Sequence, residues 1–268
     1  MYPPVRKRYG QHFLHDPGVI RRIVEAVNPR PDERLLEIGP GLGAITLPLL
    51  DAAGRLEAVE IDRDLADRLE DLARGRGDLR LHRADALRFD LGELGEGPDL
   101  RIVGNLPYNI STPLLFRLLA AHTRIRDLHL MLQREVVERM QARPGGRPYG
   151  RLSVMIQYRC RIEPLFTIGK GAFRPAPKVE SAFVRLIPLD APPVAVHDEA
   201  RFGTLVTQAF SRRRKTLRNA LCGLLSEPEI RALGLDPGVR PERLGLAEFA
   251  RLSNAGGGTH RAGDGNEG

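Results

Sequence analysis

The sequence has little cysteine, and its cysteines show no spacing typical of disulfides or metal sites. Among its 268 residues only Cys160 and Cys222 are cysteines, and neither belongs to a C-x-x-C pair. The sequence therefore indicates neither a disulfide framework nor a zinc site. Of the seven histidines only His12 and His15 stand close together, and no set of metal ligands is completed around them. We expect no metal.

Long apolar runs are missing as well. Charged residues interrupt every apolar stretch well before the ~18 residues that a membrane-spanning helix needs. The basic segment 1–14 is not followed by the apolar core of a secretory signal. The expectation is a cytoplasmic protein without a membrane partner.

Lysine is scarce, although the formal net charge is +7. Such a charge favours a polyanionic partner such as nucleic acid. Only four of the 41 basic residues are lysines, however, and a general bias toward arginine would give the same charge without any RNA. Local clusters carry more weight, and each is either a solvated face or a nucleic-acid contact. They are Arg6-Lys7-Arg8 and Arg212-Arg213-Arg214-Lys215, the latter followed by Arg218.

Short apolar runs alternate with helical periods from about residue 17 to 133. Strands separated by helices of this length predict a parallel sheet with helices on both faces, which is a Rossmann-type α/β architecture. The expected strands are 34–38, 56–61, 79–83, 101–103 and 128–132, and the expected helices are 19–27, 44–53, 63–73 and 112–121.

The remainder of the chain predicts a smaller helical part. Helices are expected at 134–142 and 152–158, and strands at 164–168 and 182–187 form an antiparallel edge. After the linker Asp190-Ala191-Pro192-Pro193, helical periods cover about 198–210, 212–225, 227–233 and 246–253. We expect a Rossmann-like catalytic domain over 1–189, a small all-helical domain over 190–254 and a disordered, glycine-rich tail over 255–268.

A glycine-rich turn joins the first strand to its helix. It reads Glu37-Ile38-Gly39-Pro40-Gly41-Leu42-Gly43, and its glycines allow a nucleotide to approach the backbone closely. The spacing G-x-G-x-G departs from the dinucleotide fingerprint G-x-G-x-x-G. S-adenosylmethionine suits it better, because this cofactor has no phosphate and carries a sulfonium and an ammonium that Glu37 can balance.

Two further acids end neighbouring strands. Glu60 is placed where a carboxylate can accept hydrogen bonds from both ribose hydroxyls, and Asp85 can accept one from the adenine amine of the cofactor. The alternative is a strand-turn-helix with incidental acids. The common position at strand carboxyl ends favours a ligand site, because open α/β sheets bind ligands there.

The tetrapeptide Asn105-Leu106-Pro107-Tyr108 follows the fourth strand. The Asn105 side-chain oxygen and the Leu106 carbonyl can accept the two N–H bonds of an adenine amine, which localises its lone pair toward a methyl donor. Pro107 stiffens the turn. The Tyr108 ring can stack on an extruded base, a contact worth about 1–3 kcal/mol. The alternative is an ordinary strand-ending turn, since Asn and Pro are common turn residues.

Together these motifs resemble those of the ribosomal RNA adenine dimethylases, and the resemblance covers nearly the whole chain. Three further segments carry it, the last of them resembling the helical-domain signature of the bacterial small-subunit (16S) rRNA branch. They are Gly10-Gln11-His12-Phe13-Leu14-His15-Asp16, Phe173-Arg174-Pro175-Ala176-Pro177-Lys178-Val179, and Phe210-Ser211-Arg212-Arg213-Arg214-Lys215-Thr216-Leu217-Arg218-Asn219.

The resemblance implies a class I methyltransferase fold and further site residues. His12 and Leu14 are expected to line the cofactor site with Gly39, Glu60, Asp85 and Asn105, and Phe173 to pack on the target adenine opposite Tyr108. Position 12 is often asparagine in this family and is histidine here. The implied reaction is double N6-methylation of two adjacent adenosines in the 3′-terminal hairpin of small-subunit rRNA, by a monomer acting on a partly assembled 30S subunit.

Three alternatives stay open. A large-subunit rRNA methylase of the antibiotic-resistance type has a similar catalytic domain, although the 210–219 signature favours the small-subunit branch. A non-catalytic ribosome-assembly factor could keep the fold. The intact motif residues Asn105, Pro107 and Tyr108 argue against this alternative. An NAD-dependent oxidoreductase is disfavoured by the glycine spacing.

Overall fold

The structure, a computed structural model, describes residues 11–31, 33–94 and 99–255. The Arg6-Lys7-Arg8 cluster, Gly10 and the tail beyond Ala255 lie outside these residues. The chain forms two compact units: Met1–Val137 with Cys160–Leu189, and Glu138–Arg159 with Asp190–Gly268. This division differs from the single boundary expected at residue 190. Residues 138–159 group with the C-terminal helices because Tyr149, Val154 and Tyr158 are buried in their core.

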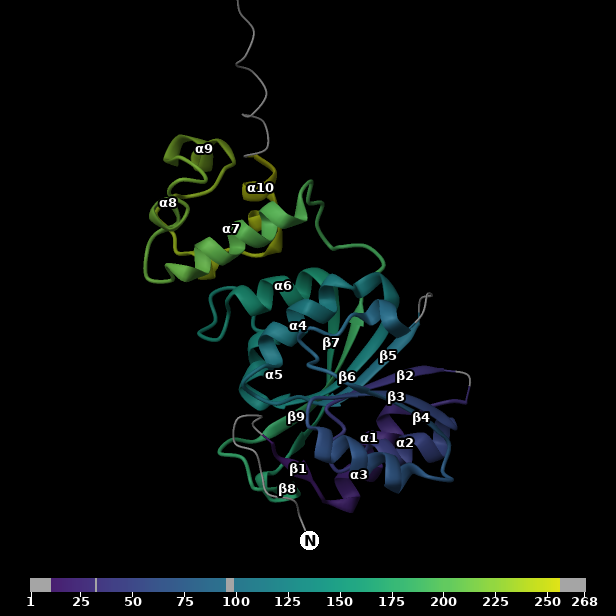
Figure 1. Cartoon of the computed structure of the whole chain (residues 1–268). Coiled ribbons are helices and arrows are strands. Elements are labelled where there is room, and N and C mark those ends of the chain that lie inside the picture. Colours follow the sequence, from purple (N-terminus) through teal and green to yellow (C-terminus); the bar gives the residue numbers. More distant parts are fainter. Residues whose placement is uncertain (1–10, 32, 95–98, 256–268) are drawn as a thin grey trace, which may run out of the picture. The chain divides into compact units, whose positions relative to one another are not determined.

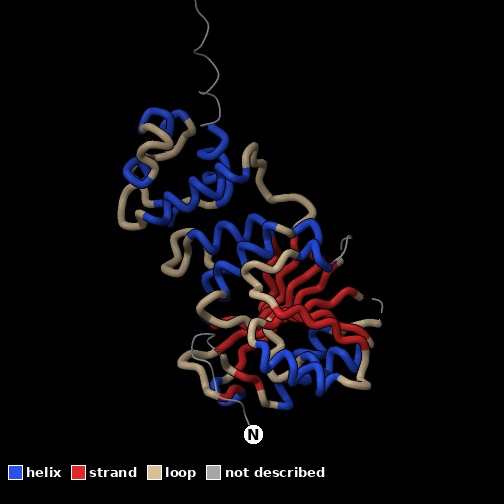
Figure 2. The backbone as a smooth tube through the Cα atoms, in the orientation of Figure 1, coloured by secondary structure: helices blue, strands red, loops and turns tan. Residues whose placement is uncertain are grey.

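A 7-stranded mixed sheet forms the centre of the first unit, in the order β4-β3-β2-β5-β6-β9-β7. The strands from β4 to β6 are parallel, whereas β9 runs antiparallel to both β6 and β7. Figure 2 shows this sheet as the red layer of the molecule. Both the parallel part and the antiparallel edge predicted from the sequence are thus confirmed. The bounds are β2 (Arg34–Ile38), β3 (Arg55–Glu60), β4 (Asp78–Arg83), β5 (Leu100–Asn105), β6 (Ile125–Gln133), β7 (Cys160–Ile168) and β9 (Ser181–Pro188).

Helices cover both faces of this sheet. In Figure 1, α1 (Pro17–Val27), α2 (Thr46–Ala53) and α3 (Arg63–Ala73) lie on one face and α4 (Ser111–Ala120) lies on the other. Helix α1 begins two residues before the range expected from the sequence, because the Asp16 carboxylate accepts the Val19 N–H at 2.9 Å and Pro17 needs no donor partner in the first turn. Its residues Ile23 and Val27 are buried in the core beneath the sheet.

A second, 2-stranded sheet was not expected from the sequence. Strand β1 (Phe13–Leu14) pairs antiparallel with β8 (Phe173–Arg174), so that Phe13 lies opposite Arg174 and Leu14 opposite Phe173. The pairing is continued by the His15 N–H, which donates to the Ala172 carbonyl at 2.9 Å. Two segments that carry the family resemblance, far apart in the sequence, therefore lie side by side.

The second unit is helical. It contains α6 (Arg151–Arg159), α7 (Glu199–Ser211), α8 (Leu217–Ala220), α9 (Glu227–Ala232) and α10 (Leu246–Ala255), and α5 (Arg134–Gln141) leads into it. Phe202, Leu205 and Phe249 are fully buried in its core. In the described part of the chain, no helix is both long and apolar enough to cross a membrane.

The helix predicted over 212–225 is wrong. Helix α7 ends at Ser211, residues 212–215 form a turn closed by the Lys215 N–H on the Arg212 carbonyl at 2.8 Å, and α8 covers only Leu217–Ala220. Four successive cations are poor helix neighbours because like charges one turn apart repel. The turn also places Leu217 in the core, where its N–H donates to the Val239 carbonyl at 2.7 Å.

Candidate active site

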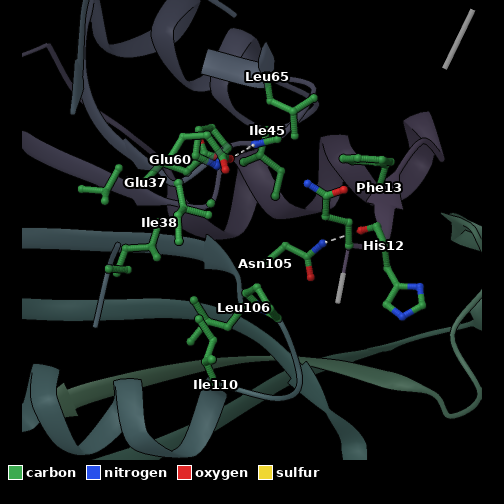
Figure 3. Close-up of a pocket in the computed structure, with 18 of the residues that line it drawn as sticks. His12, Phe13, Glu37, Ile38, Ile45, Glu60, Leu65, Asn105, Leu106 and Ile110 are labelled. Atoms are coloured by element: carbon green, nitrogen blue, oxygen red, sulfur yellow. Dashed lines mark hydrogen bonds between the residues drawn. The ribbon is translucent and has the colours of Figure 1, made fainter. Parts of the chain in front are cut away.

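A cavity of about 270 Å³ lies at the carboxyl ends of β2, β3, β4 and β5. Its wall contains every residue of the target-base motif and most of the cofactor residues predicted from the sequence. Figure 3 shows part of this wall, with Glu37 beside Glu60 and Asn105 bonded to His12. The predicted site residues that line the cavity are His12, Leu14, Glu37, Gly39, Gly41, Glu60, Asp85, Asn105, Leu106, Pro107 and Tyr108.

The glycine turn forms one side of the cavity through its backbone. Gly39 and Gly41 have φ angles of +69° and +55°, a left-handed conformation that glycine adopts without steric cost. A Cβ atom on Gly41 would touch the Phe13 ring at 3.4 Å. Gly43 differs: it does not line the cavity, and a Cβ atom there would meet Leu69 Cδ1 at 2.6 Å. Gly43 is therefore placed for close packing of the loop on α3, not against a ligand.

Glu37 is a buried acid at the cavity wall. Only 2% of the residue is exposed, and its Oε2 atom has no hydrogen-bond partner among the described residues. Burial raises its pKa from 4.5 to about 8, and the neighbouring Glu60 carboxylate adds to this rise. An unpartnered buried carboxyl oxygen stabilises a cationic ligand by becoming its counterion.

Glu60 is held by the backbone on both sides. Its Oε2 accepts the Gly41 N–H at 3.1 Å and its Oε1 accepts the Asp62 N–H at 2.9 Å. Burial nevertheless raises its pKa above the ordinary value. The bond to Gly41 fixes the carboxylate against the glycine turn, and each oxygen keeps a lone pair for a further donor. This is the geometry that a diol-binding carboxylate requires.

Asp85 also lines the cavity, in the loop after β4. Its Oδ1 atom accepts the Leu87 N–H at 2.9 Å, and its backbone carbonyl accepts the Phe89 N–H at 2.8 Å. The side chain is therefore fixed in a tight turn and not freely rotating. Its second carboxylate oxygen is available to a donor such as a ring amine.

Asn105 is oriented by the N-terminal segment. Its Nδ2 atom donates to the His12 carbonyl at 3.0 Å, and among the described residues no donor bonds to its Oδ1. The amide thus presents an acceptor at the cavity, as the sequence-based reasoning requires. The neighbouring Leu106 is buried, and its N–H donates to the Met131 carbonyl of β6 at 3.2 Å.

Tyr108 is held at both ends. The Ser111 hydroxyl donates to its carbonyl at 3.2 Å, and its phenol oxygen lies 2.6 Å from the Ser181 hydroxyl. Burial raises the pKa of the phenol, so the ring stays neutral. The His12 ring lies beside it, with centroids 5.6 Å apart, and His12 Nδ1 is 2.7 Å from the Pro175 carbonyl. A carbonyl oxygen accepts only, so this nitrogen is the protonated one.

Phe173 is not placed as expected. Its side chain is 2% exposed, belongs to the core beneath the sheet and does not line the cavity. The β1–β8 pairing sets Phe173 opposite Leu14, and both residues belong to that core cluster. In this structure no face of the ring is open to a base.

The sequence reasoning missed several residues near the site, among them Gln11, Ile61 and Ser181. Gln11 lines the cavity and donates to Asp62 at 3.2 Å, Ile61 lines it with 43% of its surface exposed, and Ser181 contacts Tyr108. The position of Ile61 directly after Glu60 could have indicated its role, because it continues a strand carboxyl end. No local pattern marks Gln11 or Ser181.

The cationic cluster 212–215 lies on the surface of the second unit, and its members differ. Arg213 is 3.8 Å from Glu242, and Arg218 is 3.0 Å from Glu227. Arg214 and Lys215 are exposed and make no ion pair in the part of the chain that the structure describes. Arg212 makes no ion pair there either, but its guanidinium donates to the Asn219 carbonyl at 3.2 Å. Arg214 and Lys215 are therefore the cations most available to an external anion.

The polar groups of the cavity fit S-adenosylmethionine. The unpartnered Glu37 oxygen suits a cation, the Glu60 carboxylate suits a pair of hydroxyls, and Asp85 suits an amine. Apolar side chains, including Ile38 and Ile61, supply surface for a flat ring. No phosphate cradle is needed for this cofactor, which agrees with the glycine spacing.

Comparison with known proteins gives a consistent result. The sequence matches the family described as ribosomal RNA adenine dimethylase over residues 4–255. The Ribosomal RNA small subunit methyltransferase A of Nitrosococcus oceani is 56% identical over 250 residues, which cover 92% of this chain and 94% of that protein. The protein of the same name from Chromohalobacter salexigens is 56% identical over 254 residues, with 93% and 90% covered.

The comparison with solved structures agrees with the comparison of sequences. A dimethyladenosine transferase from Plasmodium falciparum superposes with a TM-score of 0.75 at 25% identity, over 90% of this chain and 96% of that one. The 23S rRNA methyltransferase ErmE gives a TM-score of 0.68 at 28% identity, over 91% and 99%. The fold is thus the Rossmann-like class I methyltransferase fold expected from the sequence. The chain belongs to the ribosomal RNA adenine dimethylase family.

Proposed function

We propose that this protein transfers methyl groups from S-adenosylmethionine to the N6 amines of two adjacent adenosines in the 3′-terminal hairpin of small-subunit (16S) rRNA, twice on each. The observation that carries the chemistry is the orientation of Asn105. Its amide nitrogen is occupied by the His12 carbonyl, so its oxygen is the group that faces an incoming amine. This acceptor lies in the same cavity as the acids that fit the cofactor.

The chain's own residues supply positioning and polarisation. Asn105 Oδ1 and the Leu106 carbonyl accept the two N–H bonds of the target amine, which turns its lone pair out of conjugation with the ring. Tyr108 stacks on the extruded base and offsets the cost of unstacking it, which is a few kcal/mol. When bound, the cofactor supplies the electrophilic methyl group. As the new N–C bond forms, the carbon–sulfur bond breaks and the amine releases one proton to water, so no strong base is needed.

The choice of a small-subunit substrate rests on sequence relatives. The relatives at 56% identity bear the name small-subunit methyltransferase, whereas the large-subunit methylase ErmE is 28% identical. Arg214 and Lys215 supply exposed charge for a phosphate backbone. We further propose that the protein acts as a cytoplasmic monomer on a partly assembled 30S particle, where the terminal hairpin is accessible.

The test is methyl transfer from labelled cofactor to ribosomal particles, followed by mapping of the modified nucleotides by mass. Undermethylated small subunits should gain four methyl groups on two adjacent adenosines. Fully methylated small subunits are the matched control and should gain none. Label found only in large-subunit RNA would favour the antibiotic-resistance type of activity. Label in neither RNA, with RNA binding retained, would favour a non-catalytic assembly factor.

A further inference from the structure

The side chain of Ser181 contacts Tyr108 and has no role of its own in the proposed reaction. Its hydroxyl lies 2.6 Å from the Tyr108 phenol oxygen, and the residue is fully buried. Neither residue predicts the other from the sequence, because 73 positions separate them. A serine hydroxyl is too small to add much apolar packing, so its hydrogen bond is its main contribution here.

The backbone around Ser181 is a rigid platform. Ser181 is the first residue of β9 and pairs with Gln133 of β6 on one side and Ile168 of β7 on the other. Next to it, the Glu180 carbonyl accepts the Arg134 N–H at 3.0 Å. A strand bonded on both sides is among the least mobile parts of a fold.

Tyr108, in contrast, lies on a connection between elements. It follows β5 in the turn that leads to α4, and the Ile110 N–H closes that turn on the Pro107 carbonyl at 3.1 Å. Backbone bonds of this kind fix the main chain but leave rotation of the side chain open. The phenol end of the ring is fixed by Ser181, and the ring side is limited by the His12 ring at 5.6 Å.

We propose that Ser181 is a positioning residue for the target adenine: its buried hydroxyl fixes the phenol end of the Tyr108 ring, beside the His12 ring, so that a base stacked there presents its amine to Asn105 Oδ1. This inference rests on the proposed function. It assigns to the sheet a direct part in substrate alignment, through a side chain that does not itself line the cavity. Alignment of this kind matters because reacting groups must be held in a near-attack geometry.

The expected effect follows from the strength of one neutral hydrogen bond. Ser181→Ala should lower kcat/KM for RNA about 3- to 10-fold, because such a bond has a net worth of ~1 kcal/mol. The Kd for the cofactor should stay unchanged, since Ser181 is not part of the cavity wall. A merely structural residue would lower kcat/KM and raise the apparent cofactor Kd together, through loss of folded protein.

The decisive experiment is a double-mutant cycle with Tyr108→Phe, which removes the same hydrogen bond from its other end. Ser181→Ala should lower kcat/KM in the wild-type chain and have no further effect in the Tyr108→Phe chain. An equal loss in both backgrounds would show that Ser181 acts independently of Tyr108 and would overturn the proposal. No loss in the wild-type chain would overturn it as well.

A matched control and a second measurement separate positioning from folding. Ser153→Ala removes another fully buried serine hydroxyl, one bonded to the Arg139 carbonyl in the second unit, and should leave kcat/KM unchanged. Nuclear magnetic resonance of isotope-labelled tyrosine, with the Tyr108 signal assigned from Tyr108→Phe, should show that signal shifted in Ser181→Ala. An unshifted signal would mean that the bond does not form in solution.

Failure of the proposed function looks different from failure of this inference. A wild-type chain that methylates no RNA contradicts the proposed function, and the resonance measurement, which needs no substrate, still decides whether Ser181 holds the ring. A wild-type chain that is active, with independent effects of Ser181→Ala and Tyr108→Phe, contradicts the inference alone.

Discussion

The side-chain amide of Asn105 donates a hydrogen bond of 3.0 Å to the backbone carbonyl of His12. This bond joins the target-base motif to the N-terminal segment, and that segment is itself paired through β1 with β8. The orientation of the amide at the centre of the cavity therefore depends on two parts of the chain that are remote in sequence. It also explains why the segment around His12 belongs to the site although it precedes the sheet.

The first prediction concerns Asn105 itself. Asn105→Ala removes the acceptor for the target amine, so kcat should fall about 100-fold or more, the loss seen when an oriented polar group of a transition state is removed. The Kd for the cofactor, measured by isothermal titration calorimetry, should change by no more than about 5-fold, because the net worth of an uncharged hydrogen bond is ~1 kcal/mol. Turnover close to the wild-type rate would contradict the role given to Asn105.

Glu60 provides the second prediction. Glu60→Ala should raise the cofactor Kd at least about 10-fold, because hydrogen bonds to a charged group are worth ~1.5–3 kcal/mol. Glu57→Ala is the matched control, since Glu57 lies on the same strand but bonds to His82 and does not line the cavity. Equal Kd values for the Glu60 and Glu57 variants would remove Glu60 from the cofactor contact. Calorimetry measures both.

The site residues predicted at the ends of strands share one property: the function of each follows from its place on a strand. Glu37, Glu60 and Asn105 lie in the last two positions of neighbouring parallel strands, and parallel strands bring their carboxyl ends to one edge. The strand-turn-helix pattern therefore predicts that they meet. The same reasoning gave the order of the elements, because apolar periodicity decides between helix and strand.

Phe173, which was misplaced, and Ser181, which was missed, depend on remote pairing. Phe173 is buried because β8 pairs with β1, and Ser181 reaches Tyr108 because β9 inserts between β6 and β7. Neither pairing has a local sequence signal. The helix expected over 212–225 failed for a related reason, since burial of Leu217 against distant residues decides where α7 ends. Helical periodicity alone cannot predict such a contact.

The third prediction concerns RNA binding by the second unit. Replacing both Arg214 and Lys215 with glutamine should weaken binding of small-subunit RNA and reduce the slope of log K against log salt by about 1 for each phosphate that is no longer neutralised. These two cations are exposed and unpaired with acids among the described residues. Arg231→Gln is the control, because Arg231 is already paired with Glu227 at 2.8 Å. An unchanged slope in the double variant would indicate that the cluster is a solvated surface and does not contact the RNA.

The last prediction concerns pH and Glu37. The pKa of Glu37 is raised from 4.5 to about 8 in the folded chain, so its carboxyl group is protonated at neutral pH. Folding therefore takes up a proton when the pH lies between 4.5 and about 8. This group's contribution to the free energy of unfolding is therefore full below about pH 4.5 and is lost as the pH rises toward 8, by at most ~1.4 kcal/mol per pH unit.

Binding of a cationic cofactor should show the opposite dependence. A cation favours the ionised carboxylate, so the Kd should fall by up to about 10-fold per pH unit as the pH rises toward 8, and then level off. Binding near pH 7 should also release a proton, which calorimetry in buffers of different ionisation enthalpy detects. Glu37→Gln isolates this contribution from those of Glu60 and the cofactor amine. If the variant released as many protons as the wild type, Glu37 would not be the counterion, because glutamine has no proton to give up in this range.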